Sequence, residues 1–258
     1  MSAGRSSARF RGKVAIVTGG GSGIGEAAAR RLALEGAYVV VADVADDAGE
    51  AVASNIGGQF VHLDVGNAAE WAKVVDEVES TRGGIDLAHL NAGIALGAYP
   101  VVVEELTDAE YERIMSVNAD GVFHGIRAVV PSMKRRGGGA IVVTSSLAGV
   151  GPHPDDPIYA ATKHFVIGLV RSLGCPFKEH GITVNAVCPG AVDTPLLDAT
   201  GRRDAIEARR RPLMIGDDIA EAVTMLLAGS ETGHVYTVMS GRGAERYEFP
   251  GIPGMPST

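Results

Sequence analysis

Short apolar, β-branched runs alternate with stretches of helix-forming residues along the whole chain. The apolar runs have the length and composition of buried strands, and the stretches between them favour helices. The pattern predicts strands near residues 13–18, 38–43, 59–63, 86–90, 139–144, 182–188 and 234–239. It predicts helices near residues 23–36, 46–54, 67–82, 108–134, 157–174 and 216–229.

This alternation is typical of right-handed βαβ units, which build a parallel sheet with helices on both faces. The predicted fold class is therefore α/β, a doubly wound parallel sheet of about seven strands. Neither a Pro/Ser-rich linker nor an internal repeat divides the sequence, so residues 1–258 are expected to form a single domain. Within it we expect a flexible tail at 1–11, a substrate lid at 195–215 and an irregular tail at 244–258.

One local feature works against this regular pattern. Pro176 has no backbone N–H, and its ring clashes with the carbonyl of Ser172 in a straight helix. Gly174 weakens the helix further. The helix that begins near Pro157 is therefore predicted to end or kink between Ser172 and Pro176.

Composition and charge exclude several classes of partner. The net charge of −8 argues against nucleic acid or an anionic membrane as the main partner. No apolar run approaches the length of about 18 residues that a membrane span needs, and the N-terminus lacks the apolar core of a secretory signal. Two cysteines and seven scattered histidines show no metal-ligand spacing, so no metal is expected. A cytoplasmic protein is the prediction.

A glycine-rich segment from Thr18 to Gly25 lies between the first predicted strand and the first predicted helix. Glycines permit a sharp turn and a close backbone approach, and the N–H groups at a helix start attract a pyrophosphate. Asp43 ends the second predicted strand, at the distance expected for a carboxylate that binds ribose. The segment predicts a Rossmann-type dinucleotide-binding sheet; the alternative is an ordinary turn, with Asp43 as a helix cap.

Other predicted strand ends carry polar or small residues at the same edge of the sheet. Asp64, followed by Val65, either accepts a hydrogen bond from an adenine amino group or caps the following helix. Asn91, Ala92 and Gly93 follow the fourth strand and leave room for a flat ligand. Asn118 lies inside a predicted helix, where asparagine is unfavourable.

A possible acid/base pair follows the fifth strand. Tyr159 and Lys163 are four residues apart and share one face of a predicted helix. A lysine ammonium favours the phenolate and lowers the tyrosine pKa, so that the tyrosine can exchange a proton with a substrate oxygen. Ser146, at the strand end, can hold the same oxygen. After the sixth strand, Thr194 could bind a carboxamide or a phosphate.

Together these residues resemble the short-chain dehydrogenase/reductase family over about residues 11–243. The resemblance implies that Tyr159 is the general acid/base, Lys163 lowers its pKa and binds the nicotinamide ribose, Ser146 orients the substrate, and Asn118 holds a relay water. It implies that NAD is the cofactor, bound by Gly19, Ser22, Gly23, Ile24, Gly25, Asp43, Asp64, Val65, Asn91, Ala92, Gly93, Tyr159, Lys163, Pro189, Gly190, Val192 and Thr194.

The resulting expectation is an NAD-dependent oxidoreductase that acts on a secondary alcohol or ketone. The residues expected around the substrate, at 94–99, 147–154, 191 and 195–215, are mostly apolar, which favours a steroid, a hydroxy-lipid or another hydrophobic alcohol. The arginines at 202, 203 and 209–211 form either a solvated helix face or a site for an anionic substrate group. The alternative function is an inactive NAD-sensing protein.

The resemblance also implies a homo-oligomer, with a tetramer favoured, in which helices 108–134 and 157–174 meet a partner. Ile114, Val117, Val122, Ile126 and Val129 exceed one buried stripe, which suggests burial on two sides. The C-terminal tail carries apolar side chains and is expected to pack on a neighbouring subunit near the lid.

Overall fold

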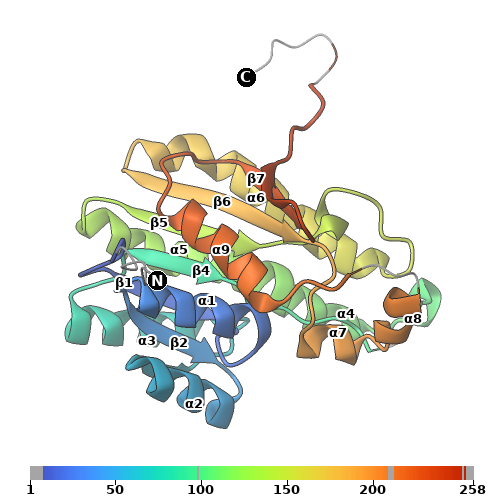
Figure 1. Ribbon diagram of the computed structural model, residues 1–258, viewed down its shortest axis with the longest axis horizontal. Coiled ribbons are helices and arrows are strands. Elements are labelled where there is room, and N and C mark those ends of the chain that lie inside the picture. The colour runs from blue at the N-terminus through green and yellow to red at the C-terminus, as the bar shows by residue number, and fades with distance from the viewer. Residues whose placement is uncertain (1–7, 98, 209–211, 252, 254–258) are drawn as a thin grey trace, which may run out of the picture.

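A computed structural model describes residues 8–97, 99–208, 212–251 and 253 (Figure 1). In this part of the chain, eight strands form one sheet in the order β3-β2-β1-β4-β5-β6-β7-β8. All neighbours are parallel except β7 and β8, which are antiparallel. The strands are β1 Val14–Thr18, β2 Tyr38–Asp43, β3 Gln59–His62, β4 Leu87–Leu90, β5 Gly139–Thr144, β6 Ile182–Pro189, β7 Val235–Met239 and β8 Gly243–Arg246.

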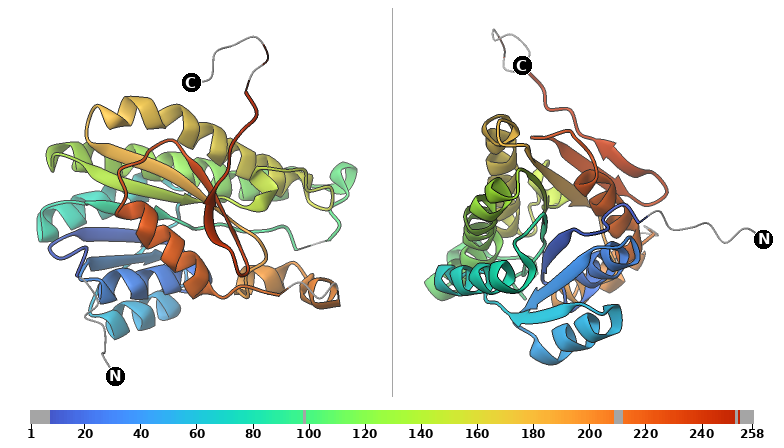
Figure 2. Two further views of the ribbon diagram at one scale, coloured as in Figure 1. Left: turned by 45° about the horizontal axis from the view of Figure 1, so that its top comes forward. Right: turned by 90° about the vertical axis from the view of Figure 1, so that its left-hand side faces the viewer.

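Helices cover both faces of this sheet, as the end-on view in Figure 2 shows. The helices are α1 Gly23–Leu34, α2 Asp46–Ile56, α3 Ala68–Arg82, α4 Asp108–Met115, α5 Gly121–Arg135, α6 Pro157–Lys178, α7 Pro195–Ala199, α8 Arg203–Ala208 and α9 Gly216–Leu227. Side chains of α3, α5 and α6 pack on one face, and those of α1, α2 and α9 pack on the other. The predicted fold class is confirmed, with an eighth strand added.

The sequence of β1 is apolar at successive positions because both faces of the strand are buried. Ile16 packs into the core cluster on the α3, α5 and α6 side, whereas Ala15 and Val17 pack into the cluster on the opposite side. Because both faces of a doubly wound sheet are covered, every position of such a strand is buried. The strand order reverses at β1, which pairs with both β2 and β4. The carboxyl ends of β1 and β4 therefore border the crevice where such sheets bind ligands.

The helix predicted at 108–134 is not continuous. It consists of α4, a π-helical segment η2 at Ser116–Asp120, and α5. Asn118 lies in this segment and is fully buried. Its amide bonds to the backbone of Ile94 in both directions, with distances of 2.8 and 2.9 Å. A widened turn inside a helix re-aims its side chains and is frequent at functional sites.

Of the two alternatives for this helix, an end between Ser172 and Pro176 is wrong, because α6 continues to Lys178; a kink there stays a prediction. Tertiary packing supports the last turn: Phe177 contacts the core, and Gly174 is so close to Gly233 that an added Cβ would lie 2.5 Å from the Gly233 Cα. Pro176 and Ser172 are both exposed, so water can reach the Ser172 carbonyl that has no helical N–H partner. These contacts therefore hold the last turn in helical form despite the unfavourable proline.

The described part of the N-terminal tail is packed, in contrast to the predicted flexible tail at 1–11. Phe10 is buried, and its N–H donates to the carbonyl of Glu35 at 3.0 Å. Arg9 forms an ion pair with Glu35 at 2.6 Å. The burial of Phe10 under α1 is a tertiary contact that the basic composition of the segment does not reveal. Residues 1–7 lie outside the described residues.

The C-terminal segment also differs from the irregular tail predicted at 244–258. A turn with positive φ at Gly241 and Gly243 reverses the chain, and β8 then pairs with β7. Tyr247 and Phe249 pack on the core of their own subunit, and Phe249 lies under the Arg171 guanidinium at 3.9 Å. Figures 1 and 2 show this segment leaving the sheet away from α7 and α8 of the same chain, and packing on a neighbouring subunit stays a prediction. Positions 252 and 255 lie outside the described residues.

Candidate active site

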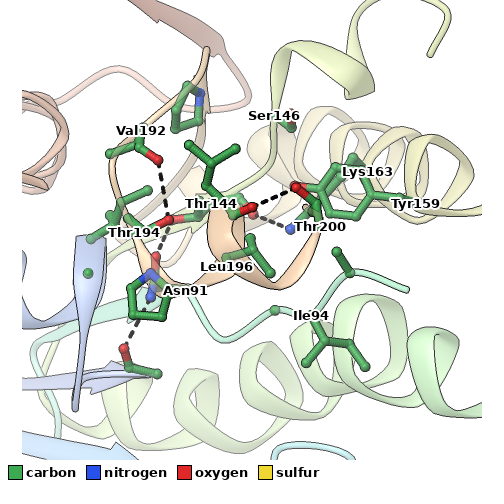
Figure 3. A pocket seen from close by; sticks show the side chains of 18 of the residues that line it. Asn91, Ile94, Thr144, Ser146, Tyr159, Lys163, Val192, Thr194, Leu196 and Thr200 are labelled. Atoms are coloured by element: carbon green, nitrogen blue, oxygen red, sulfur yellow. Dashed lines mark hydrogen bonds between the residues drawn. The ribbon is translucent and has the colours of Figure 1, made fainter. Parts of the chain in front are cut away.

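A cavity of about 890 Å³ opens at the carboxyl ends of the parallel strands. Its wall combines the turn after β1, the ends of β2 to β6, one face of α6, and the segment that carries α7 and α8. Part of this wall is drawn in Figure 3. The cavity therefore collects the strand ends that the sequence singles out, as expected for a doubly wound sheet.

The glycine turn forms one end of the cavity. Gly19 and Gly23 have φ of +61° and +54°, a conformation that residues with a side chain rarely adopt. An added Cβ on Gly19 would lie 3.0 Å from the Ala92 Cα, so a larger residue would fill the space between the two strand ends. Ser22, Gly23 and Ile24 line the cavity at the start of α1. The turn therefore fits a pyrophosphate held against backbone N–H groups.

Gly25 is the one predicted cofactor residue of this turn that the cavity wall does not include. An added Cβ there would lie 2.0 Å from the carbonyl oxygen of Gly19 and 2.8 Å from the side-chain nitrogen of Asn91. The residue is buried, and its role is to let the first turn of α1 pack against the loop. Its contribution to a ligand site is indirect.

Asp43 lines the cavity at the end of β2. Its carboxylate accepts hydrogen bonds from the N–H of Gly21 at 2.9 Å and of Ala45 at 3.0 Å. It is not the cap of α2, because that position belongs to Ala45. The carboxylate thus tethers the glycine turn to the end of the second strand while it faces the space where a ribose would lie.

Asp64 and Val65 also line the cavity. The helix-cap alternative for Asp64 is wrong, because Asn67 caps α3 and accepts from the Ala69 N–H at 3.0 Å. Asp64 instead accepts from the N–H of Gly66 at 2.9 Å. Its position beyond β3 is that expected for a contact with the adenine end of a dinucleotide.

Asn91 joins the ends of three strands. Its side-chain nitrogen donates to the carbonyl of Thr18 at 3.2 Å, and its backbone N–H donates to the Thr18 hydroxyl at 2.9 Å. Thr144 donates to its side-chain oxygen at 3.1 Å. Ala92 and Gly93 continue the cavity wall. With both ends of its amide bonded, Asn91 holds β1, β4 and β5 in fixed relative positions at the cavity floor.

Asn118 does not line the cavity, unlike the other predicted catalytic residues. It lies behind Gly93, where an added Cβ would be 3.4 Å from both the Asn118 side-chain oxygen and the Lys163 Nζ. Its side-chain nitrogen is also 3.3 Å from the Thr162 hydroxyl. The structure therefore places Asn118 next to Lys163, on the protein side of the wall.

Ser146, Tyr159 and Lys163 meet at the centre of the cavity wall. Asp156 caps α6 by accepting from the Tyr159 N–H at 2.9 Å, and Pro157 occupies the first helical turn. The helix start thus sets the position of Tyr159. One turn later, Lys163 lies 5.5 Å from the centre of the Tyr159 ring and donates to the Thr144 carbonyl at 3.1 Å, as Figure 3 shows.

Burial controls the protonation of this pair. It raises the pKa of Tyr159 to about 12, although a hydrogen bond with Ser146 acts in the opposite direction. It lowers the pKa of Lys163 to about 8. Both shifts favour the neutral side chain. The expected lowering of the tyrosine pKa by Lys163 is therefore not found: desolvation dominates the shift, and the Ser146 hydrogen bond is what opposes it. Lys163 is the member of the pair that titrates closer to neutral pH.

The remaining predicted cofactor residues follow β6. Pro189, Gly190, Val192 and Thr194 all line the cavity. Thr194 lies opposite the glycine turn, because an added Cβ on Gly23 would be 3.0 Å from its methyl group. This segment therefore closes the space between the glycine turn and the acid/base pair.

Tyr99, His153 and Arg202 line the cavity, and they fall in the stretches 94–99, 147–154 and 195–215 that were expected around the substrate. The sequence did not indicate that the three side chains contact one another. They belong to three separate segments, so no local spacing connects them. Of the two alternatives for the arginines, Arg203 fits the solvated face, since it pairs with Asp198 at 2.6 Å, whereas Arg202 faces the cavity. The arginines at 209–211 lie outside the described residues.

Comparison with known proteins agrees with this geometry. The family model described as short chain dehydrogenase matches residues 13–205. The chain is 41% identical over 195 residues to a 3-alpha-(or 20-beta)-hydroxysteroid dehydrogenase of Mycobacterium tuberculosis, covering 74% of each. It is 37% identical over 253 residues to an NADP-dependent (R)-specific alcohol dehydrogenase of Lentilactobacillus kefiri, covering 92% of the chain and 99% of the relative.

Among solved structures, a 3-ketoacyl-(acyl-carrier-protein) reductase from Brucella melitensis complexed with NADH superposes with a TM-score of 0.84 at 33% identity. The match covers 90% of this chain and 99% of that one. These matches define the class of oxidoreductases that use a nicotinamide cofactor. The chain belongs to the short-chain dehydrogenase family.

Across the residues that the structure describes, no cluster of histidine, cysteine, aspartate and glutamate side chains has the geometry of a metal site. In the same residues, no helix combines the length and the apolar character needed to cross a membrane.

The buried lysine yields a prediction for stability. Because burial lowers the pKa of Lys163 from 10.5 to about 8, its ammonium destabilises the folded state at pH 7. Lys163→Met should therefore raise the free energy of unfolding at pH 7 by roughly 1–3 kcal/mol, after the lost bond to Thr144 is deducted. The folded lysine loses its proton near pH 8 and the unfolded one near 10.5, so the advantage of the variant should shrink as the pH rises through that range.

Denaturant unfolding at pH 7, 8.5 and 10 measures this difference. Lys178→Met is the control, since Lys178 is exposed on the last turn of the same helix and should show no such pH dependence. If the free energy of unfolding changed with pH in the same way in the wild type and in Lys163→Met, the assignment of a buried, charged lysine would be contradicted.

Proposed function

We propose that this protein is an NAD-dependent oxidoreductase that interconverts a hydrophobic secondary alcohol and its ketone. The observation that carries the proposal is the meeting of Ser146, Tyr159 and Lys163 on the wall of a cavity that begins at the glycine turn. The turn and the end of β2 fit a dinucleotide, and the three side chains offer a proton and hydrogen bonds beside its far end. When bound, the nicotinamide supplies the site that accepts or donates the hydride.

The cofactor would be held by the residues predicted from the sequence. Gly19, Ser22, Gly23 and Ile24 would contact the pyrophosphate, and Asp43 the adenosine ribose. Asp64 and Val65 would flank the adenine, and Asn91, Ala92 and Gly93 the neighbouring ribose. Pro189, Gly190, Val192 and Thr194 would bind the carboxamide end. Gly25 would support the turn from behind.

Each catalytic side chain has a distinct task in this proposal. Tyr159 holds a proton at its phenolic oxygen and passes it to, or takes it from, the substrate oxygen. Ser146 donates to the same oxygen and orients it. Lys163 binds the nicotinamide ribose and, as an ammonium, favours the phenolate over the neutral form that burial prefers. Asn118, bonded to Ile94 and close to Lys163, would hold a water that carries the proton onward.

The character of the substrate is inferred from the outer part of the cavity. Leucine, isoleucine, proline and methionine side chains dominate there: Ile94, Leu147, Pro195, Leu196, Leu197, Ile206, Pro212 and Met214. Such a lining favours an apolar molecule with one reactive oxygen. The printed names of the relatives, a hydroxysteroid dehydrogenase and an alcohol dehydrogenase, are consistent with that class.

Removal of the phenolic oxygen tests the proposed reaction. Tyr159→Phe keeps the ring but loses the proton-transfer group, so kcat should fall by roughly 10²–10⁴-fold while NAD still binds. NADH absorbance with a panel of secondary alcohols measures turnover, and calorimetry measures NAD affinity. Tyr38→Phe is the control, because its hydroxyl bonds to Arg82 far from the cavity. The alternative, an inactive NAD-sensing protein, predicts NAD binding without turnover in the wild type.

Asp43 leads to a prediction for cofactor choice. A 2′-phosphate at this position would face a carboxylate, and neither Val44 nor Ser22 offers a compensating charge. NAD should be preferred over NADP by about tenfold or more in kcat/KM, roughly 1.4 kcal/mol. Asp43→Asn should reduce the preference, whereas Asp64→Asn, at the adenine end, should not. Equal wild-type efficiency with both cofactors would refute the assignment.

We also propose a homo-oligomer, with a tetramer favoured. The apolar residues that suggested two-sided burial are instead buried within the subunit, as for Ile114 and Val129. Support comes from Phe123 on α5 and Phe165 on α6, large apolar side chains that are each 42% exposed. Light scattering at micromolar concentration should give a multiple of the 26.6 kDa chain mass, and Phe123→Glu combined with Phe165→Glu should lower it. A monomeric wild type would refute assembly.

A further inference from the structure

Three side chains from separate segments meet at the outer end of the cavity. Tyr99 follows β4, His153 precedes α6, and Arg202 lies between α7 and α8. The Arg202 guanidinium stacks on the Tyr99 ring at 4.2 Å and lies 3.2 Å from the His153 Nε2. The Tyr99 hydroxyl bonds to the same nitrogen. The cluster therefore links the predicted lid to two fixed loops.

Two donors share one acceptor in this cluster. A guanidinium can only donate, so the His153 Nε2 accepts, its proton lies on Nδ1, and the Arg202 N–H and the Tyr99 hydroxyl share the single lone pair of Nε2. Burial, and then the charge of Arg202, lower the pKa of His153, which keeps the ring neutral and able to accept. Asp155 lies 3.6 Å from the guanidinium and balances its charge. The Arg202 and Tyr99 side chains are thus held from several directions.

These side chains lie between two cavities. A second cavity of about 440 Å³ lies outside the first. Four residues line both: Tyr99, Thr200, Arg202 and Ile206. The outer cavity adds backbone and polar surface from Gly97, Pro100, Asp155 and Gly201. The stacked pair of Tyr99 and Arg202 therefore forms the loop-borne part of a partition that Thr200, and Ile206 of α8, complete.

The partition limits the room for a substrate. The inner cavity extends from Asp43 and Leu63, at the dinucleotide end, to Tyr99 and Ile206, so its 890 Å³ must hold both the cofactor and the substrate. We propose that Tyr99 and Arg202 determine substrate length: they restrict the reaction to compact apolar alcohols and ketones and exclude molecules that extend into the outer cavity. This inference rests on the proposed function and specifies its substrate class.

A homologous series of 2-alkanols, from 2-butanol to 2-dodecanol, tests the length limit. Each methylene buried in the apolar inner cavity should raise kcat/KM about fourfold. In the wild type this gain should stop where the alkyl chain reaches the partition. In Tyr99→Ala and in Arg202→Ala it should continue for about two or more further carbons, because the outer cavity then joins the inner one. For each protein variant, the kcat/KM of every 2-alkanol is divided by the value for 2-butanol with the same variant.

Tyr99→Phe is the matched control. It keeps the ring that fills the space and loses only the hydroxyl bond to His153, so its length limit should equal that of the wild type. The same limit in Tyr99→Ala, Arg202→Ala and wild type would overturn the proposal. A limit that moves in Tyr99→Phe as far as in Tyr99→Ala would also overturn it, since the cause would then be loop disorder and not the filled space.

Binding separates this inference from the proposed function. Stabilisation by each 2-alkanol in the presence of NAD, measured as the shift in Tm, reports how far the alkyl chain is accommodated without any turnover. If the wild type oxidises no member of the series, the proposed function fails. The Tm shifts alone then show whether Tyr99 and Arg202 limit the length of the bound alkyl chain. If the wild type turns over and neither kcat/KM nor Tm responds to Tyr99→Ala at greater length, only the partition fails.

Discussion

A single backbone contact determines how the rest of the site is assembled. The first turn of α1 packs so tightly on the loop after β1 that an added Cβ on Gly25 would lie 2.0 Å from the Gly19 carbonyl oxygen. This approach brings the helix start, with its free N–H groups, to the edge of the sheet. It also brings the loop within reach of the Asn91 side chain, which bonds to the Thr18 carbonyl and accepts from Thr144.

Thr144 also connects these contacts to Lys163 and Tyr159. The Thr144 carbonyl accepts from Lys163, and Lys163 lies against the ring of Tyr159. The glycine turn and the proposed catalytic side chains are therefore connected through the ends of β1, β4 and β5. A change in the spacing of these strands would therefore displace the glycine turn and the Tyr159–Lys163 pair at the same time.

The site combines groups whose charged forms burial disfavours. The pKa of Lys163 falls to about 8 and that of Tyr159 rises to about 12, both because the side chains are removed from water. The buried Lys163 ammonium costs stability in the folded protein at neutral pH, whereas Tyr159 is protonated there and carries no such cost. The apolar strands around the pair, buried on both faces, offset that cost. Burial of the apolar strands thus stabilises the fold, while the titratable Tyr159–Lys163 pair lies at the cavity wall.

The sequence alone determined seven of the eight strands, the parallel character of the sheet and the residues at the strand ends. Buried strands of a doubly wound sheet are apolar at every position, and the glycines, Asp43, Tyr159 and Lys163 lie at spacings set by local backbone geometry. Asp64 remained ambiguous until the structure gave the cap of α3 to Asn67. That decision depends on hydrogen bonds between residues that composition does not distinguish.

Tertiary packing decided what local propensity could not. The helix α6 passes Pro176 because Gly174 and Phe177 are held by contacts far away in sequence. The segment after Gly241 becomes a strand because β7 offers an unpaired edge. Arg202 meets Tyr99 and His153 only when three distant segments converge. Contacts of this kind have no period or spacing along the chain, so only the folded structure reveals them.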